Sequence, residues 1–275
     1  MRAFDLNLMR KLLFPPTCAG CGERLVPVSQ NSATYHKVCF CSSCLEKWHL
    51  SRAEMCKKCG KDALNCECIS PFLRNLQPEL PALCFYHSGV TEVSDRVIIN
   101  LKQRYNKELI SYISLELLPL IVSALNKVGV EGEDCIFTWI PRKRSNLAKF
   151  GFDQGKELCV QIAAGFGQKP YYLLDRIGGK EQKKLDQSKR AKNVDHSIIL
   201  NTSAKRKSKC EGIENLFYTL KGKTVVVIDD VITSGATVKR AVELLQDAGA
   251  ERVLVSCVAK TKLKGRITVE IRTRF

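Results

Sequence analysis

The chain has 275 residues, of which 45% are hydrophobic and 26% charged, with a net charge of +16. This composition is that of an ordinary globular protein, and the length allows one large domain or a domain with a smaller module. No run is expected to approach the ~18 apolar residues that a membrane span needs. Residues 1–18 carry Asp5, interspersed charges and no small-residue cleavage site, so we interpret them as a short amphipathic segment rather than a signal peptide. We therefore expect a cytoplasmic protein without a membrane span.

Paired cysteines dominate the first quarter of the chain. Nine of the 14 cysteines lie between Cys18 and Cys68, and eight of them form turns of the type C-x-x-C or C-x-C. Two such turns bring four thiolates around one tetrahedral Zn²⁺, whereas unpaired buried cysteines leave the spacing unexplained and disulfides are rare in the cytosol. The predicted metal ligands are Cys18, Cys21, Cys41 and Cys44 for one site and Cys56, Cys59, Cys66 and Cys68 for the other.

Four cysteines around zinc leave no open coordination position, so we expect one or two structural Zn²⁺ sites that support folding and take no part in catalysis. Cys39 lies two residues before Cys41 and is an alternative ligand in its place. We predict two domains, a zinc-binding cysteine-rich module over residues 1–72 and an α/β domain over residues 73–275. The linker between them, residues 69–81, contains three prolines and no clear periodicity.

The apolar pattern after the linker alternates between strands and helices. Strands are predicted at 82–89, 134–141, 171–177, 223–230 and 252–260, and amphipathic helices within 93–129, 150–167 and 238–250. This alternation indicates an α/β fold with a mostly parallel sheet flanked by helices on both faces. Residues 178–197 are polar and basic with little apolar periodicity, which is typical of a mobile functional loop or a disordered segment.

Basic residues are concentrated in one part of the chain. Residues 141–210 hold 17 lysines and arginines and 6 acidic residues, a net charge of +11. Such a stretch can be a solvated face that keeps the protein soluble, or it can bind an anionic partner, either a phosphorylated small molecule or nucleic acid. Aromatic residues are sparse within it, so the sequence does not support specific readout of bases.

The segment VVVIDDVITSGATV, residues 225–238, carries the strongest functional signal. It begins with four apolar residues, as in a strand covered on both faces, and a helical pattern resumes at Val238. The small residues between them allow close backbone approach, and the first N–H groups of the helix lack partners within it, so this turn predicts a phosphate site. Additional hydroxyl donors come from Thr233, Ser234 and Thr237.

Two carboxylates, Asp229 and Asp230, end the strand directly before that turn. Carboxylates accept hydrogen bonds from hydroxyl groups, so the pair and the turn together fit a ribose 5-phosphate. Two other interpretations stay open: a strand end whose Asp caps an ordinary turn, and a phosphoacceptor receiver domain, where such a pair opens the domain. The run T-S-G-A-T in register with the acidic pair favours the sugar-phosphate site.

These residues resemble a known signature. VVVIDDVITSGAT is similar to the motif with which type I phosphoribosyltransferases bind phosphoribosyl pyrophosphate (PRPP) with Mg²⁺. The paired-cysteine module followed by such a domain resembles the ComF family of bacterial competence proteins, as do FPPTCAGC, LKQRYNKEL, WIPRKR, FGFDQGKEL and EQKKLDQSKRAKNV. The resemblance implies a type I phosphoribosyltransferase-like fold. It also implies PRPP contacts from Asp229, Asp230, Thr233, Ser234, Gly235, Ala236 and Thr237.

The resemblance implies functional residues outside the motif as well. Pro141, Arg142 and Lys143 match the loop that holds pyrophosphate, and Gln182 and Arg190 match a mobile loop that closes over PRPP. An arginine in that loop would neutralise the leaving pyrophosphate. The implied catalytic residues are Asp229, Asp230 and Arg190.

Function and partners follow from the same resemblance. It implies a PRPP-binding competence protein that acts in DNA uptake and natural transformation and transfers phosphoribosyl to a nucleophile that the sequence does not name. The alternative is a non-catalytic protein that binds single-stranded DNA and other DNA-uptake proteins and uses PRPP as a regulatory ligand, and a zinc-stabilised scaffold without ligand is a third. Phe150 and Asp153 depart from the family pattern R-G-F-N-Q, which has Arg and Asn there.

Overall fold

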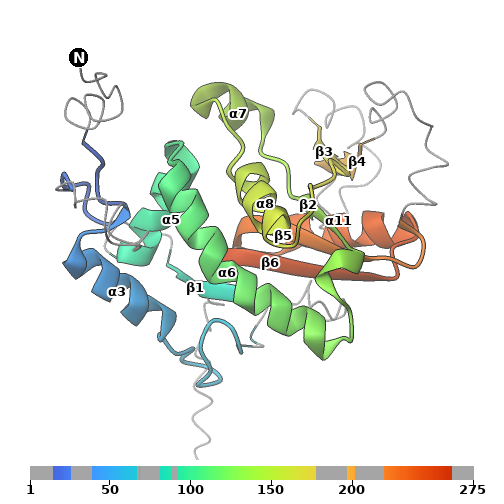
Figure 1. Cartoon of the computed structure of the whole chain (residues 1–275), viewed down its shortest axis with the longest axis horizontal. Coiled ribbons are helices and arrows are strands. Elements are labelled where there is room, and N and C mark those ends of the chain that lie inside the picture. The colour runs from blue at the N-terminus through green and yellow to red at the C-terminus, as the bar shows by residue number, and fades with distance from the viewer. Residues whose placement is uncertain are drawn as a thin grey trace, which may run out of the picture.

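A four-stranded parallel sheet forms the centre of the molecule (Figure 1). The computed structural model describes residues 15–25, 39–66, 68, 81–87, 92–177, 197–201 and 220–261. The strand order is β1-β6-β5-β2, and every neighbouring pair is parallel. The strands are β1 (Ala82–Tyr86), β2 (Cys135–Trp139), β5 (Thr224–Ile232) and β6 (Arg252–Thr261). The predicted α/β fold with a mostly parallel sheet is confirmed.

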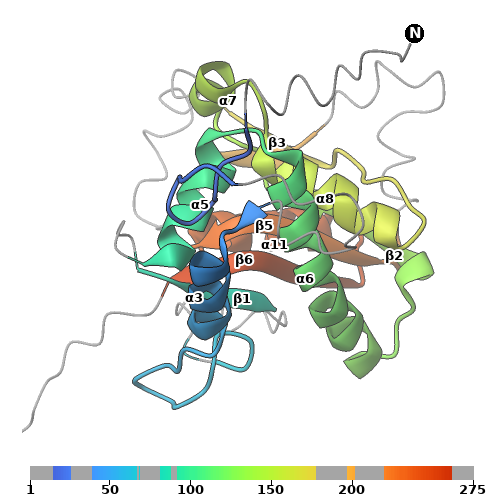
Figure 2. The same cartoon turned by 60° about the vertical axis from the view of Figure 1, so that its left-hand side comes forward.

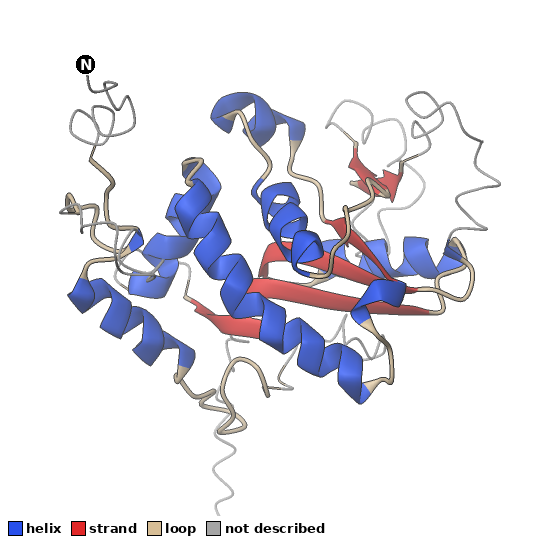
Figure 3. Cartoon of the chain, viewed as in Figure 1, coloured by secondary structure: helices blue, strands red, loops and turns tan. Residues whose placement is uncertain are grey.

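Helices lie on both faces of this sheet (Figures 2 and 3). One face is covered by α5 (Val93–Gln103), α6 (Lys107–Lys127) and α8 (Gln154–Gly165), and the other by α11 (Ala236–Asp247). Alternate residues of β5 enter the two cores: Val226 packs with the first set of helices and Val225 with α11. This two-sided burial explains why the strand is a continuous apolar run.

The buried face of α11 follows the predicted helical period. Val238, Ala241, Val242 and Leu245 are its buried residues. The chain then leaves the helix at Gly249, whose φ of 97° is the left-handed conformation that favours glycine at a helix end. The sequence pattern therefore placed this helix and its packing face correctly.

Helix α6 is, by length and composition alone, able to cross a membrane. Half of its most apolar stretch is buried inside the fold, where α6 packs against α8 and the sheet. Leu109, Ile113 and Leu117 are fully buried along one face. The expectation that no run approaches the length of a spanning helix is therefore wrong, and the place of α6 in the core accounts for its apolar composition.

Two other elements differ from the sequence-based expectation. The strand predicted at 171–177 shortens to β3 (Leu174–Arg176), which pairs antiparallel with β4 (Ile198–Leu200) outside the main sheet. Only Leu174 of β3 is buried, so this strand lacks the two-sided burial of the parallel strands. A short helix, α7 (Arg144–Phe150), was not predicted, because none of its residues is buried and its sequence carries no apolar period.

The cysteine-rich part of the chain packs directly on this domain. Helix α3 (Ser42–Arg52) contacts α5 and β1. Trp48 of α3 is fully buried, and its Nε1 donates to Glu116 of α6 at 3.2 Å. The two parts therefore share one apolar core. The boundary predicted between residues 72 and 73 lies outside the described residues and stays a prediction.

Candidate functional site

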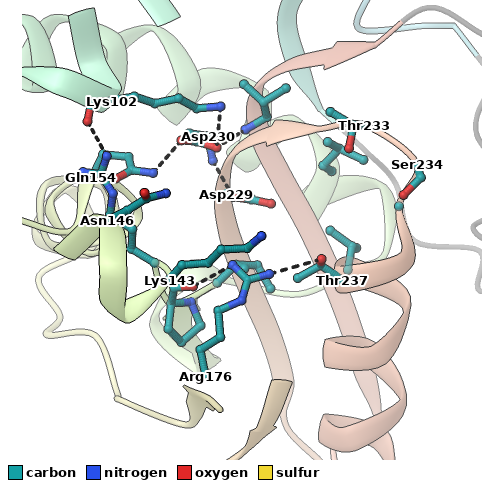
Figure 4. A pocket seen from close by; sticks show the side chains of 17 residues that line it. Lys102, Lys143, Asn146, Gln154, Arg176, Asp229, Asp230, Thr233, Ser234 and Thr237 are labelled. Atoms are coloured by element: carbon teal, nitrogen blue, oxygen red, sulfur yellow. Dashed lines mark hydrogen bonds and ion pairs between the residues drawn. The ribbon is translucent and has the colours of Figure 1, made fainter. Parts of the chain in front are cut away.

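A polar cavity of about 370 Å³ opens where β2 and β5 end (Figure 4). The carboxyl edge of an open α/β sheet is where ligands bind, and this volume is in the usual range for small-molecule sites. The loop after β2 and the turn from β5 to α11 form two of its walls. Single side chains from four other elements also line it, namely Lys102 from α5, Asn146 from α7, Gln154 from α8 and Arg176 from β3.

Asp230 is fixed by partners on all sides and is only 6% exposed. Its Oδ1 accepts the N–H of Val231 at 2.6 Å and lies 3.7 Å from Nζ of Lys102. Its Oδ2 accepts a hydrogen bond from Nε2 of Gln154 at 2.6 Å. The carboxylate therefore has one orientation, with a cation beside it, before any ligand enters.

Asp229 has fewer partners and a different electrostatic setting. Its Oδ1 accepts the N–H of Asp230 at 2.8 Å. Burial, followed by the charge of Asp230, raises the pKa of Asp229 well above its usual value, although Lys102 and Arg176 oppose this. Hydroxyl donors or a cation entering the cavity would favour the ionised form. The pair thus combines one fixed carboxylate with one whose charge depends on what is bound.

The turn before α11 has the features of an anion site. Gly235 has a φ of 81° and is the N-cap of α11, so the helix begins at Ala236 with its first N–H groups at the cavity. Four residues of this turn line the cavity: Thr233, Ser234, Gly235 and Thr237. Ala236 does not, and its N–H donates instead to Oγ of Ser234 at 3.5 Å.

The loop after β2 lines the opposite wall with Pro141, Arg142 and Lys143. Arg142 is buried, and its guanidinium donates to the carbonyls of Phe152 at 3.1 Å and Lys102 at 2.5 Å. It also lies over the ring of Phe150 at 4.5 Å. The side chain of Arg142 therefore supports the loop from inside, and exposed Lys143 is the cation of this loop that extends over the cavity (Figure 4).

Asp153, one of the departures from the family pattern, holds this loop against α8. Its Oδ1 caps the helix by accepting the N–H groups of Gly155 at 3.1 Å and Lys156 at 3.3 Å. Its Oδ2 accepts Nε1 of Trp139 at 3.3 Å and the backbone N–H of Arg142 at 3.0 Å. Both carboxylate oxygens face donors only, which an Asn side chain cannot provide.

Lys102, Gln154 and Arg176 were not predicted as site residues. Arg176 joins two walls of the cavity, since its guanidinium donates to the carbonyl of Pro141 at 3.2 Å and to Oγ1 of Thr237 at 3.4 Å. Its Nε also donates to Oγ of Ser197 at 3.3 Å. Lys102 and Gln154 lie in LKQRYNKEL and FGFDQGKEL, stretches that carry the family resemblance, which could have identified them. Arg176 has no comparable signal. Gln182 and Arg190 lie outside the described residues.

Two groups of four cysteines each converge to a point. Cys18, Cys21, Cys41 and Cys44 form one group and Cys56, Cys59, Cys66 and Cys68 the other, with all sulfur atoms of a group within 4.8 Å of one another. The Sγ atoms of Cys18 and Cys41 are 3.8 Å apart, close to the spacing of about 3.8 Å between thiolates bound tetrahedrally to zinc. Both groups could hold a zinc ion.

The environment of the first cysteine in each group favours the thiolate. Although burial opposes it, backbone N–H groups of Cys41, Cys21 and Gly20 lower the pKa of Cys18 to about 7. Backbone N–H groups likewise lower the pKa of Cys56 to about 7 against the effect of burial. Cys39 is fully buried and is not among the converging sulfurs, so the group formed around Cys18 uses Cys41.

Comparison with known proteins first defines a class. Residues 180–271 match the phosphoribosyl transferase domain family. Orotate phosphoribosyltransferase of Chlorobium phaeobacteroides is 41% identical over 114 residues, covering 40% of this chain and 55% of the enzyme. A solved purine phosphoribosyltransferase from Pyrococcus horikoshii matches with a TM-score of 0.31 and 17% identity, covering 54% of this chain and 73% of its own. The C-terminal part of this chain is a phosphoribosyltransferase-like domain.

Two relatives match over nearly the whole length. Competence protein ComFC of Streptococcus pneumoniae is 26% identical over 248 residues, 86% of this chain and 96% of that protein. DNA utilization protein YhgH of Salmonella typhimurium is 25% identical over 223 residues, 80% of this chain and 90% of its own. With the two cysteine groups, these matches confirm the predicted resemblance: the chain is a homologue of ComFC and YhgH, and its residues 180–271 match a phosphoribosyl transferase domain.

Proposed function

We propose that this protein binds PRPP with Mg²⁺ in the cavity between β2 and α11 and acts in the cytoplasm as a phosphoribosyltransferase-like competence protein in DNA uptake. One observation carries the proposal. The acidic pair Asp229 and Asp230 and the glycine turn before α11 line the same cavity. Acceptors for ribose hydroxyls thus lie next to donors for a 5-phosphate, and no third element has to move to bring them together.

The cations of the cavity suit the rest of that ligand. Lys143 and Arg176 lie on the side of the cavity formed by the loop after β2 (Figure 4). A pyrophosphate group held there would face Pro141 and Lys143, as the family resemblance implies. The same resemblance implies that Gln182 and Arg190 contact this group. Carboxylate oxygens of Asp229 and phosphate oxygens are the donors that Mg²⁺ prefers, and the ion would neutralise charge on the pyrophosphate.

In the catalytic form of the proposal, the phosphoribosyl group of PRPP is transferred to a nitrogen nucleophile. The nitrogen lone pair forms a bond to ribose C1 while the bond from C1 to pyrophosphate breaks, and the electron pair of that bond leaves on pyrophosphate. The proton of the nucleophile leaves with pyrophosphate or water. The chain contributes orientation through Asp229 and Asp230 and charge stabilisation through Lys143, Arg176 and the implied Arg190.

A second form of the function is a single-stranded-DNA-binding protein in which PRPP is a regulatory ligand. Helix α7 favours it, because this helix stands beside the cavity with no buried residue and exposes Arg144 and Lys149. Basic residues on an exposed helix give salt-dependent contacts to DNA phosphates. Other DNA-uptake proteins would then be the partners of the complex.

Calorimetric titration of the zinc-loaded protein with PRPP and Mg²⁺ tests the common part of both forms. We expect saturable binding to the wild type, loss of at least tenfold in affinity in Asp230→Asn, and unchanged affinity in Asp247→Asn, an exposed acid at the far end of α11. Pyrophosphate release with added nucleophiles then separates the enzyme from the DNA-binding protein. Absence of PRPP binding to a folded, zinc-loaded wild type would overturn the proposal.

A further inference from the structure

The first cysteine group touches α5 at its backbone. The carbonyl of Ala19, inside the turn formed by Cys18 and Cys21, accepts a hydrogen bond from Nδ2 of Asn100 at 2.6 Å. A Cβ at Gly20 would lie 2.7 Å from Sγ of Cys44 and 3.2 Å from Cγ1 of Val93. This turn is therefore pressed between the sulfur ligands on one side and α5 on the other, with no space for a side chain.

The same helix reaches the sugar-phosphate cavity two residues further on. Nζ of Lys102 lies 3.7 Å from Oδ1 of Asp230 and 5.7 Å from the centre of the Tyr86 ring. The backbone carbonyl of Lys102 accepts the guanidinium of Arg142, which supports the loop after β2. One turn of helix thus joins the cysteine turn, at Asn100, to both walls of the cavity, at Lys102.

The second group of cysteines packs on a different part of the domain. The second group packs against the edge of the sheet, where Cys56 and Cys66 form a small core with Phe85. It also has a polar link to the sheet, because Nζ of Lys260 donates to the carbonyl of Cys66 at 2.9 Å. These contacts connect the second group to the strands β1 and β6.

We propose that the first cysteine group is a positioning element of the ligand cavity. With metal bound, the turn at residues 18–21 is rigid, Asn100 holds α5 against it, and Lys102 stays beside Asp230 with its carbonyl under Arg142. This inference rests on the proposed function, because PRPP is the ligand whose binding reports it. Metal in the first group and PRPP in the cavity then stabilise the same position of α5, so each increases the affinity for the other.

The test uses Asn100→Ala, which removes the contact without changing a cysteine or a residue of the cavity. Zinc content is measured first, and PRPP affinity is then measured by calorimetry with Mg²⁺ against Asn126→Ala, an exposed asparagine on α6. We expect full zinc content and an affinity lower by roughly 5- to 20-fold in Asn100→Ala, in the usual range of coupling between sites. In a Lys102→Met background the same substitution should change affinity by less than about twofold.

A second measurement needs no variant. Zinc release from the wild type to a zinc-selective colorimetric chelator is followed with and without saturating PRPP and Mg²⁺. We expect the ligand to slow release from one of the two cysteine groups and to leave the other unchanged. Equal release with and without PRPP, or an Asn100→Ala protein that binds PRPP as well as Asn126→Ala, would overturn the coupling. A wild type that holds two zinc ions and binds no PRPP would overturn the proposed function instead.

Discussion

Asp153→Asn is the substitution that most directly tests how the loop after β2 is held. The two oxygens of Asp153 accept four N–H groups, from Trp139, Arg142, Gly155 and Lys156, at 3.0 to 3.3 Å. Asn is the residue that the family pattern has at this position, and it differs only by an amide nitrogen in place of one oxygen. That nitrogen must face one of the two pairs of donors, whichever way the amide turns.

The cost follows from that geometry. Two hydrogen bonds to a charged acceptor are lost, at about 1.5–3 kcal/mol each, and part of this is recovered because the partner groups reach water or shift. A total loss of about 2–4 kcal/mol in the free energy of unfolding is expected, with a fall of roughly 5–15 °C in Tm for a domain of this size. Because Trp139 and Arg142 are buried, recovery by water is incomplete.

Thermal and urea unfolding of the zinc-loaded protein measure this loss, with Asp247→Asn as the matched control on an exposed site. If the free energy of unfolding of Asp153→Asn lies within about 0.5 kcal/mol of that of the wild type, the four contacts do not stabilise the loop. Asp at this position would then have no structural advantage over Asn.

Two further predictions concern the acidic pair and the first cysteine group. Because burial and the charge of Asp230 raise the pKa of Asp229, Asp229→Asn should unfold at higher urea concentration than the wild type at pH 7.5. The gain should shrink as the pH falls through the folded-state pKa and vanish below about pH 3, where the wild-type carboxyl is protonated in both the folded and the unfolded state. A gain that grows on acidification would contradict the assignment. Gly20→Ala places a Cβ 2.7 Å from Sγ of Cys44, so zinc measured by atomic emission should fall from two ions per chain toward one. Retention of both ions with unchanged Tm would show that the turn is not tightly packed.

The parts of the fold that could be predicted are those whose signal is local. Burial in two cores determines the apolar run at Val225–Ile228, and burial in one of these cores determines the helical period of α11. Each pattern is complete within one short segment, so the sequence alone predicts it. Helix α7 has no such pattern, because it buries no residue and depends on Arg142 and Phe150 stacking at its ends. Pairing of β3 with β4 depends on residues far apart in the chain, which no local period indicates.

The candidate site likewise has a part that the sequence predicts and a part that only the fold brings together. Asp229, Asp230 and the turn before α11 are consecutive, so their chemistry could be inferred from one short segment. Lys102, Gln154 and Arg176 are single polar residues on three different elements, and only the fold brings them to one cavity. The inward direction of Arg142 could not be inferred either. The sequence of a basic loop does not indicate whether its guanidinium contacts a ligand or, as here, backbone carbonyls of the same chain.

Lys260 is a buried cation beside the second cysteine group. It is the lysine near the end of the apolar strand β6 and is only 6% exposed, an expensive place for a charge. Burial lowers the pKa of Lys260, and the neighbouring thiols of Cys257 and Cys66 act in the opposite direction. Four thiolates around one Zn²⁺ carry a net charge of about −2, so a filled site beside the ammonium would favour its charged form. The second group therefore packs on the edge of the sheet, and with zinc bound it would balance the charge of Lys260.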